Sequence, residues 1–520
     1  MHRFVVVVVV VCAACPAPPI TEGEGDEGEG EGEEGEGEGE GELAGCVDAR
    51  QLERRDISAA VVVGDGSSGS CTEAAFDAAL ASVHAAGGGS IAFSCGGSAT
   101  LALSTEKSIT VNVVVDGGGD VVLDAGGVTR IFVMDGNFES PSPRLTLQDL
   151  ALAAGAGNGD GGDPRNGGGA VFRQGGTLEV IGCTFTGNRA PAAGQDVAGG
   201  AIMSIGGGFT LIRDSAFDDN RASNGGALGN LGNDLVVESS TFSQSQATGS
   251  GGNPGNGGNG GAISVDGEGR RVEVCRSSIA ASRANAFGGG FFRVAYAGEP
   301  TVFESVNLLG NEIADGDPSM AGAIYIQNSA FSLRRSIVRS NKATSAGGVY
   351  AGPGTTLDVE NTIFSDNTAL ASLAGAMFLD GVAGGTIRAS SFLRNRAPGP
   401  LAFGGGITGN GAGVVVTGSL FLDHEAGNGF NPITCTTQLE GGAGSFQFPV
   451  TRLGNGGGDG GSDAPGSLCA PNISAVDVDV DDEDVPLAGS VAVGANTDCP
   501  AVDLRGAPRP NPCTSGALER

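Results

Sequence analysis

The chain has 520 residues and a net charge of −32, from 60 acidic and 28 basic side chains. Such a charge repels phosphate backbones and anionic headgroups, which argues against a nucleic-acid partner. The 95 glycines suit short strands joined by tight turns. Its scattered Gly-x-Gly matches follow from this composition, so we expect no nucleotide and no other cofactor.

Residues 1–15 have the pattern of an export signal. His2 and Arg3 carry charge, and an apolar run follows from Phe4 to Val11. The run is too short to span a bilayer, which needs about 20 apolar residues. The small residues before Cys15 resemble the bacterial lipobox, which implies that Cys15 is lipid-modified and tethers the chain to a membrane. Ordinary cleavage after Ala14 is the alternative.

Residues 16–45 begin Pro-rich and continue as a Glu/Gly tract without a basic residue. A segment of this kind repels itself and buries nothing, so we expect a disordered spacer. At its end, the letters Leu43-Ala-Gly-Cys46 also fit a lipobox, but the preceding run is acidic and cannot serve as a signal core. We expect Cys46 to be a disulfide partner.

Export would place the other cysteines in an oxidising compartment, where pairing is expected. Proximity in the sequence favours three pairs: Cys71 with Cys95, Cys435 with Cys469, and Cys499 with Cys513. Cys183 and Cys275 fall inside apolar strand patterns, so we expect them to be buried free thiols. No CxxC spacing supports a zinc or redox site.

A short amphipathic helix is predicted after Cys71. Thr72 is the expected N-cap, Phe76, Leu80 and Val83 fall on one face, and Gly87 ends the helix. Before a stack of strands, such a helix would cover the apolar end and its unpaired edge.

Short β-branched runs between Gly-rich turns predict strands over residues 88–153. Two motifs then alternate with a period of about 30 residues. The first is a small-Gly-apolar step that ends at Ala170, Ala201, Ala227, Ala262, Phe291, Ala323, Val349, Ala376 and Ile407. The second has the form FxxN and ends at Asn188, Asn220, Ser245, Ser282, Asn311, Asn341, Asn367, Asn395 and His424.

These periods are explained if each repeat is one turn of a coil. The apolar position then stacks on its equivalents at one strand spacing, about 4.8 Å per coil. The fourth position, mostly Asn, would stack at a bend, where its amide bonds to the next Asn while its backbone tolerates a left-handed conformation. One coil cannot bury its own apolar row, so stability requires a stack of coils.

The motifs resemble the GGA-[ILV] and FxxN repeats of chlamydial polymorphic membrane proteins and, more widely, bacterial proteins of the pectin-lyase-like fold. The resemblance implies an all-β, single-stranded right-handed parallel β-helix with a short N-terminal capping helix. We place the β-helix at residues 46–430 and a loop-rich, disulfide-containing closing segment at residues 431–520. Cys499 to Pro510 looks like the last segment of surface proteins described as choice-of-anchor Q.

The pectin-lyase-like fold includes lyases that use acidic calcium ligands with a basic residue, and glycosidases that use paired carboxylates. Charged residues at the bend before the Asn row are the candidates here: Asp218, Asp219, Asp366, Asp423, Arg189, Arg221, Arg394 and Arg396. A solvated bend also carries charges of this kind, and fold does not imply function. Calcium is the one metal considered, at the acidic loops 158–163, 455–463 and 477–484, none of which has an EF-hand spacing.

The sequence therefore favours an exported, lipid-anchored or secreted surface protein that acts as an adhesion, display or envelope scaffold. Its expected partners are the membrane, through Cys15, and a surface protein or polysaccharide. A polysaccharide lyase or glycoside hydrolase is the alternative. A tight group of carboxylates with an arginine in a groove would favour this enzyme.

Overall fold

The structure, a computed structural model, describes residues 53–520 except residues 158, 160–161, 252–255, 268–269, 315–318, 428–432 and 451–467. The predicted signal, the spacer, Cys15 and Cys46 lie outside the described residues. Within them the chain is a parallel β-helix with one α-helix, α1 (Glu73–Ala85), and one 3-10 turn, η2 (Pro164–Asn166). No helix of this described part is long and apolar enough to cross a bilayer.

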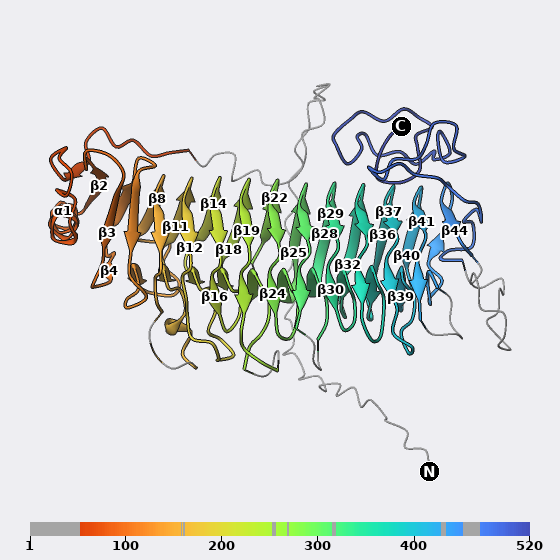
Figure 1. Cartoon of the computed structure of the whole chain (residues 1–520), viewed down its shortest axis with the longest axis horizontal. Coiled ribbons are helices and arrows are strands. Elements are labelled where there is room, and N and C mark those ends of the chain that lie inside the picture. Colours follow the sequence, from red (N-terminus) through yellow and green to blue (C-terminus); the bar gives the residue numbers. More distant parts are fainter. Residues whose placement is uncertain are drawn as a thin grey trace, which may run out of the picture. The chain divides into compact units, whose positions relative to one another are not determined.

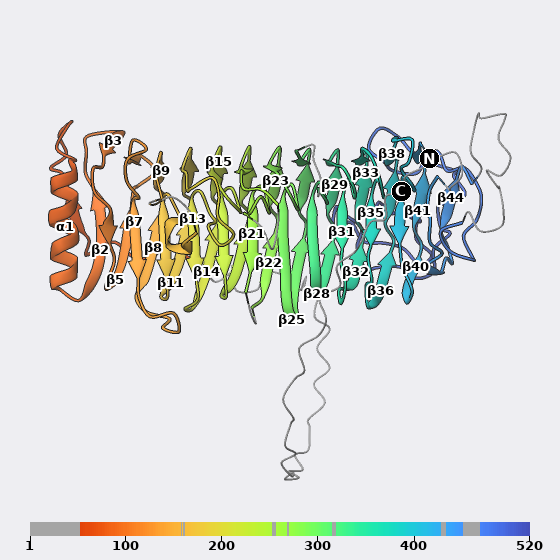
Figure 2. The same ribbon diagram turned by 90° about the horizontal axis from the view of Figure 1, so that it is seen from below.

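Strands of successive coils pair in parallel and build three sheets (Figures 1 and 2). Sheet 1 has 23 described strands in two columns, which β25 and β28 join because each runs through both. Its strands are β1 (Val61–Val63), β2 (Gly88–Phe93), β4 (Lys107–Ser108), β5 (Asn112–Asp116), β7 (Phe132–Asp135), β8 (Arg144–Gln148), β10 (Val171–Gln174), β11 (Thr177–Ile181), β13 (Ile202–Ile205), β14 (Phe209–Arg213), β17 (Leu228–Leu231), β18 (Asp234–Glu238), β21 (Ile263–Asp266), β22 (Val272–Cys275), β25 (Phe291–Glu304), β28 (Ile324–Arg334), β31 (Val349–Ala351), β32 (Thr356–Glu360), β35 (Met377–Leu379), β36 (Gly384–Arg388), β39 (Ile407–Gly409), β40 (Val414–Thr417) and β43 (Glu440–Gly441).

Sheets 2 and 3 close each coil. Sheet 2 has 13 described strands: β3 (Ala99–Ala102), β6 (Val121–Asp124), β9 (Ala151–Ala153), β12 (Thr184–Thr186), β15 (Ala216–Asp218), β19 (Thr241–Ser243), β23 (Ser278–Ala280), β26 (Asn307–Leu309), β29 (Ile337–Arg339), β33 (Ile363–Ser365), β37 (Ser391–Leu393), β41 (Leu420–Leu422) and β44 (Phe446–Phe448). Sheet 3 has eight described strands of two residues each: β16 (Arg221–Ala222), β20 (Gln246–Ala247), β24 (Arg283–Ala284), β27 (Glu312–Ile313), β30 (Lys342–Ala343), β34 (Thr368–Ala369), β38 (Arg396–Ala397) and β42 (Glu425–Ala426).

A coil turns its corners at residues with a left-handed backbone. In one coil these are Gly199 (φ 68°) before sheet 1, Asp214 (φ 50°) between sheets 1 and 2, and Asp219 (φ 48°) between sheets 2 and 3. At Gly199 an added Cβ would lie 1.8 Å from the carbonyl oxygen of Ile202, so this corner requires glycine for space as well as for conformation.

The predicted stacking of apolar side chains is confirmed. Phe185, Phe217 and Phe242 stack with ring centroids 4.6 Å apart at each step, the spacing of neighbouring strands. A second stack contains Phe364, Phe392 and Phe421. All six rings are buried, so this column forms one wall of a continuous core.

The strand register corrects the alignment of three Gly-rich steps. Phe291, Val349 and Ile407 pair in the row that contains Ile202, one position later than Ala201. A glycine precedes each of the three and replaces the alanine of the other coils. Because glycine and alanine are both small, the sequence pattern did not show that these three steps are shifted by one position.

The Asn row forms a ladder inside the corner between sheets 2 and 3. The Oδ1 of Asn341 accepts from the backbone N and Nδ2 of Asn311, at 2.9 and 3.0 Å, and its own Nδ2 donates to Asn367 at 3.0 Å. The predicted left-handed backbone is wrong for Asn: the residue before it is left-handed, as at Ser340 and Asp366. The Asn amide therefore turns inward while the preceding side chain turns out.

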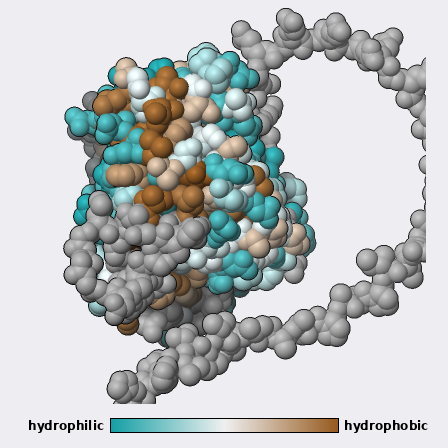
Figure 3. Space-filling view, turned by 90° about the vertical axis from the view of Figure 1, so that its right-hand side faces the viewer, coloured by the Kyte–Doolittle hydropathy of each residue, from teal (hydrophilic) through white to brown (hydrophobic). Residues whose placement is uncertain are grey.

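Helix α1 caps the first coils as predicted and lies across the end of the stack in Figure 2. The Oγ1 of Thr72 accepts from the backbone N of Ala75 at 3.2 Å, and Phe76, Leu80 and Val83 are buried. At the other end, β43 and β44 extend the stack beyond residue 430. Figure 3 faces this end, where hydrophobic side chains form a stripe among hydrophilic ones.

The three expected disulfides are present: Cys71–Cys95, Cys435–Cys469 and Cys499–Cys513. Cys183 is a buried free thiol, as predicted, and burial raises its pKa to about 12. The prediction of a free thiol is wrong for Cys275, which is disulfide-bonded. Its side chain lies on the outward face of sheet 1, in a small cluster with Ile181, Leu211 and Val236, and a strand pattern alone does not separate this face from the interior.

Candidate functional site

The predicted charged residues lie along one outer edge of the solenoid. Asp219, Asp366, Arg394 and Asp423 each occupy the left-handed corner before the Asn row, with φ of 48°, 57°, 51° and 55°. This backbone turns their side chains away from the core, which contains the neighbouring Asn. The edge therefore presents Asp219 near one end and Asp366, Arg394 and Asp423 near the other, with uncharged residues at the corners between them.

Four of the candidates form a first group, near β15 and β16. Asp219 pairs with two arginines. The Nη2 of Arg221 lies 2.8 Å from Asp219 Oδ1, and the Nη2 of Arg189 lies 3.6 Å from Asp219 Oδ2. Asp218 Oδ1 accepts from the hydroxyl of Ser243 at 2.6 Å. The side chains of Asp219, Arg189 and Arg221 are more than one-third exposed, so these pairs are solvated and contribute little.

A second group lies at the far end of the edge. Asp366 is five coils beyond Asp219, or about 24 Å at one strand spacing per coil. Arg394 contacts Asp366 at 3.2 Å, whereas Arg396 pairs separately with the exposed Glu425 at 3.6 Å. Because of this separation, the two groups cannot act on the same bond.

The second group is completed by the C-terminal segment, which Figure 1 shows in dark blue beside the last coils. Asp484 is buried and contacts Arg339 at 2.5 Å and Arg394 at 2.8 Å. The result is a groove, here called the acidic groove, lined by Arg394, Asp423, Asp477, Val478, Asp479, Val480, Asp481, Asp482 and Asp484.

The electrostatics of the acidic groove differ from those of the first group. Burial, followed by the nearby charges of Asp477 and Asp479, raises the pKa of Asp423. Burial lowers the pKa of Arg394, but Asp366 and Asp484 outweigh it and raise that pKa overall. The groove thus contains an acid that retains its proton more strongly than usual, beside a permanent cation. This combination suits proton donation to an oxygen or binding of a polar chain.

His424 belongs to the core and not to this groove. It takes the Asn position in the ladder, and full burial lowers its pKa to about 4. Its Nδ1 lies 3.4 Å from the carbonyl oxygen of Asn395. A neutral ring is therefore held inside the corner.

The acidic groove was the part that sequence reasoning missed. Residues 477–484 stood out only as acidic and loop-like, and nothing local indicated that Asp484 pairs with arginines 145 and 90 positions earlier. Of the other acidic loops, 455–463 lies outside the described residues and 158–163 lies partly outside. In the described part of the chain, no cluster of three or more His, Cys, Asp or Glu is placed to hold a metal ion.

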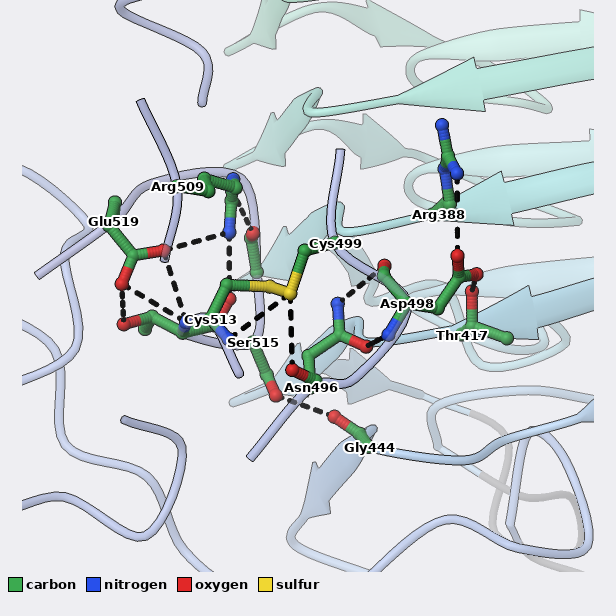
Figure 4. Close-up of a disulfide and its surroundings, with 12 residues drawn as sticks. Arg388, Thr417, Gly444, Asn496, Asp498, Cys499, Arg509, Cys513, Ser515 and Glu519 are labelled. Carbon is green, nitrogen blue, oxygen red and sulfur yellow. Dashed lines mark hydrogen bonds and ion pairs between the residues drawn. A yellow bond between two sulfur atoms is a disulfide. The ribbon is translucent and has the colours of Figure 1, made fainter. Parts of the chain in front are cut away.

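Figure 4 shows how the C-terminal segment is attached. Asn496 makes a tight turn by bonding both the backbone N and the carbonyl oxygen of Asp498 at 3.0 Å, next to the Cys499–Cys513 disulfide. Asp498 then accepts from Thr417 at 2.9 Å, which fixes the turn to the face of β40. The predicted disulfide therefore stabilises a segment that lies against the coils.

No protein-family model and no curated protein matches the chain. Among solved structures, tailspike protein 3 of bacteriophage CBA120 aligns over 74% of this chain at 10% identity, with a TM-score of 0.34. The alignment covers 60% of the tailspike's own length. The resemblances to chlamydial repeats and to choice-of-anchor Q segments stay predictions.

Two A-modules of Azotobacter vinelandii mannuronan C-5 epimerases also align. AlgE6 covers 72% of this chain and 95% of its own length at 15% identity and a TM-score of 0.31. AlgE4 covers 73% and 96% at 14% identity and a TM-score of 0.34. The parallel β-helix rests on the strand pairing described above and not on these likenesses.

Proposed function

We propose that the chain is an exported surface protein, tethered through lipid on Cys15, whose β-helix acts as a rigid scaffold that displays binding faces. The observation that carries the proposal is the set of three disulfides among the described residues. Disulfides form and persist in oxidising compartments, in agreement with the export signal pattern of residues 1–15.

The distribution of charge supports a scaffold over an enzyme. The candidate acids and bases are spread over two groups along the edge, and most are engaged in ion pairs with other side chains. A continuous core and stacked polar ladders make the body stiff, as suits a protein that presents surfaces at a distance from a membrane. The expected ligand is a surface protein or a polysaccharide.

The tether is tested on the full chain expressed in a bacterium that processes lipoproteins. Wild type should carry diacylglycerol by intact mass and partition with membranes, because the modified cysteine inserts its acyl chains into lipid. Cys15→Ser should lose the modification and move to the soluble fraction. Cys12→Ser is the matched control and should stay in the membrane.

A wild-type protein cleaved after Ala14 and freely released would reject the tether and leave a secreted scaffold. A protein that stays in the cytoplasm with reduced cysteines would reject the proposal as a whole, since its disulfides require oxidation.

The alternative, a polysaccharide lyase or glycoside hydrolase, is favoured by one observation: Asp423, with its raised pKa, lies in the acidic groove with Arg394. In this function Asp423 would donate a proton to the leaving oxygen. The test is release of reducing or unsaturated ends from acidic polysaccharides with calcium present. Activity that Asp423→Asn abolishes would establish the enzyme, and no release by wild type would exclude it for these substrates.

A further inference from the structure

The first described residues lie against the outer face of sheet 1. Residues 53–56, here called the strap, are held there by polar contacts. The backbone N of Arg55 donates to the Oε1 of Gln148 at 2.9 Å, and the Nε2 of Gln148 donates to the carbonyl oxygen of Arg55 at 3.1 Å. The guanidinium group of Arg55 pairs with Glu179. The strap is therefore fixed over β8 and β11.

The strap runs along the axis of the solenoid. The carbonyl oxygen of Asp56 accepts from the hydroxyl of Ser90 in β2 at 3.4 Å. Arg55, one residue earlier in the chain, bonds β8, which lies two coils further along the stack. The chain before the strap therefore continues towards the later coils, over β14, β18 and β22.

The same coils contain four apolar side chains that face outward and yet are buried, with exposed fractions of 8% or less. They come from β11, β14, β18 and β22 and form one cluster: Ile181, Leu211, Val236 and Cys275. Neighbouring side chains of a strand point to opposite faces, so these four point away from the core. A segment on the outside must therefore cover them.

The outward apolar surface ends at the coil of β22. In the next three coils, the row of Cys275 continues with charged residues only: Glu304, Arg334 and Glu360. The covering segment therefore extends from the strap as far as Cys275.

Cys275 is disulfide-bonded, and elimination identifies its partner. The other cysteines in the described part of the chain are in the three pairs given above or, like Cys183, are free. The remaining cysteines of the sequence are Cys12, Cys15 and Cys46, which lie outside the described residues. Cys12 belongs to the expected export signal, and Cys15 is the expected lipid site. Cys46 is left as the partner.

The distance from the strap to Cys275 suits Cys46. Gln148 and Cys275 belong to the same outward row and are four coils apart, or about 19 Å at one strand spacing per coil. Cys46 lies nine positions before Arg55, and nine extended residues span about 30 Å. The connection is therefore long enough, in the direction that the strap already takes.

From these observations, we infer that Cys46 forms a disulfide with Cys275 and that residues 46–52 continue the strap over the outward apolar cluster. Val47 and Leu52 give this segment apolar side chains for the contact. When the S–S bond forms, the two protons and two electrons of the thiols pass to the disulfide of an oxidoreductase in the export compartment, which leaves as two thiols.

This disulfide decides where the spacer leaves the solenoid. Figure 1 places β22, which ends at Cys275, near the middle of the stack of coils. A spacer that begins at Cys46 therefore holds the solenoid by its flank and not by its first coil. The disulfide itself requires only an oxidising compartment, whereas this consequence rests also on the proposed lipid tether.

The bond is tested by peptide mapping of the purified full chain without reduction. Thiols are blocked with iodoacetamide in denaturant, and the protein is digested with trypsin and Glu-C protease. We expect residues 43–50 to be linked to residues 274–276 and Cys183 to be alkylated. Alkylated Cys46, or Cys275 linked to Cys15 or to a second copy of the chain, would overturn the inference. The lipid tether is read separately, by membrane partition, so its failure leaves this map unchanged.

The position of the strap is tested with Cys46→Ser. Amide hydrogen exchange over residues 47–56 should become about tenfold faster or more, because the segment is no longer held at β22. Cys499→Ser, which breaks a disulfide of the C-terminal segment, is the matched control and should leave this exchange as in wild type. Equal exchange in wild type and Cys46→Ser would overturn the docking of residues 46–52. Circular dichroism of each variant verifies that the β-helix has folded.

Discussion

Polar side chains inside the corners satisfy backbone groups that the coil cannot pair by itself. Besides the Asn ladder, a hydroxyl ladder runs through the corner between sheets 1 and 2. The hydroxyl of Ser240 accepts from the backbone N of Ser215 at 3.1 Å, and Ser419 does the same for Ser390 at 3.1 Å. Each hydrogen bond joins one coil to the next. These buried serines therefore hold neighbouring coils together and also provide acceptors for the backbone N–H groups of the turn.

The Asn ladder leads to a prediction about Asn341. Asn341→Ala removes the acceptor for the buried backbone N of Asn311 and one of the two acceptors of its Nδ2, which keeps its hydrogen bond to the carbonyl oxygen of Ile279 at 2.8 Å. We expect the free energy of unfolding to fall by about 1–3 kcal/mol or more, measured by urea denaturation. Asn307→Ala, an exposed asparagine of the same coil as Asn311, is the control and should change it by under about 0.5 kcal/mol. Equal losses in both variants would show that the ladder does not stabilise the corner.

The residue rows show where sequence reasoning succeeds and where it stops. The Phe and Asn rows were predicted because one large or distinctive side chain recurs in each coil. The serine row has an equally regular place, two residues before the Phe position, as at Ser215 and Ser240. It was missed because serine is common in turns, so its recurrence does not stand out. The left-handed backbone was assigned one residue too late. Asparagine tolerates that conformation, but here its amide is needed inside the corner, so the preceding residue adopts it.

Helix α1 is held to the stack by charge as well as by its apolar face. Lys107 is buried, and its Nζ lies 2.7 Å from Glu73 and 2.8 Å from Asp77. Ser104 donates to Glu73 from its hydroxyl, at 2.6 Å, and from its backbone N, at 2.9 Å. The sequence predicted the helix, its N-cap and its buried face, but these contacts cross 30 to 34 residues and have no local pattern.

This cluster makes the cap sensitive to acid. Burial raises the pKa of Glu73, but hydrogen bonds from Lys107 and Ser104 outweigh it and lower the pKa from 4.5 to about 2. Because the folded pKa lies below the unfolded one, the stabilisation is complete above pH 4.5 and is lost as the pH falls towards 2. We expect Glu73→Gln to lower the Tm at pH 7 and to approach wild type near pH 2.

The measurement is a thermal melt of both proteins at intervals from pH 7 to 2. Glu139→Gln, at an exposed turn, is the control and should follow wild type at every pH. A Tm difference for Glu73→Gln that stays constant across the range would rule out the ionised carboxylate as the cause.

At the scale of the whole molecule, the solenoid and its C-terminal segment follow different rules. The solenoid is specified by a short period, so its core and most of its register are visible in the sequence. The segment after β44 has no period, and its position depends on a few long-range contacts, such as Asp484 with Arg339 and Arg394 and Asp498 with Thr417. The acidic groove arises where the C-terminal segment lies beside the last coils, and no single repeat encodes this contact.

Asp484 should control the docking of this segment. It is buried between two arginines and has a left-handed backbone (φ 66°), which asparagine also tolerates. Asp484→Asn thus removes the charge while preserving the turn. Loss of two charge-assisted bonds should lower the local opening free energy by about 1.5–3 kcal/mol, and amide hydrogen exchange over residues 477–484 should rise about tenfold or more.

Asp482→Asn, at an exposed neighbouring position, is the control and should leave exchange unchanged. Since the Phe and Asn ladders do not involve Asp484, exchange in sheet 2 should stay as in wild type. Unchanged protection of residues 477–484 in Asp484→Asn would mean that Val485 and the Cys499–Cys513 disulfide suffice to hold the segment.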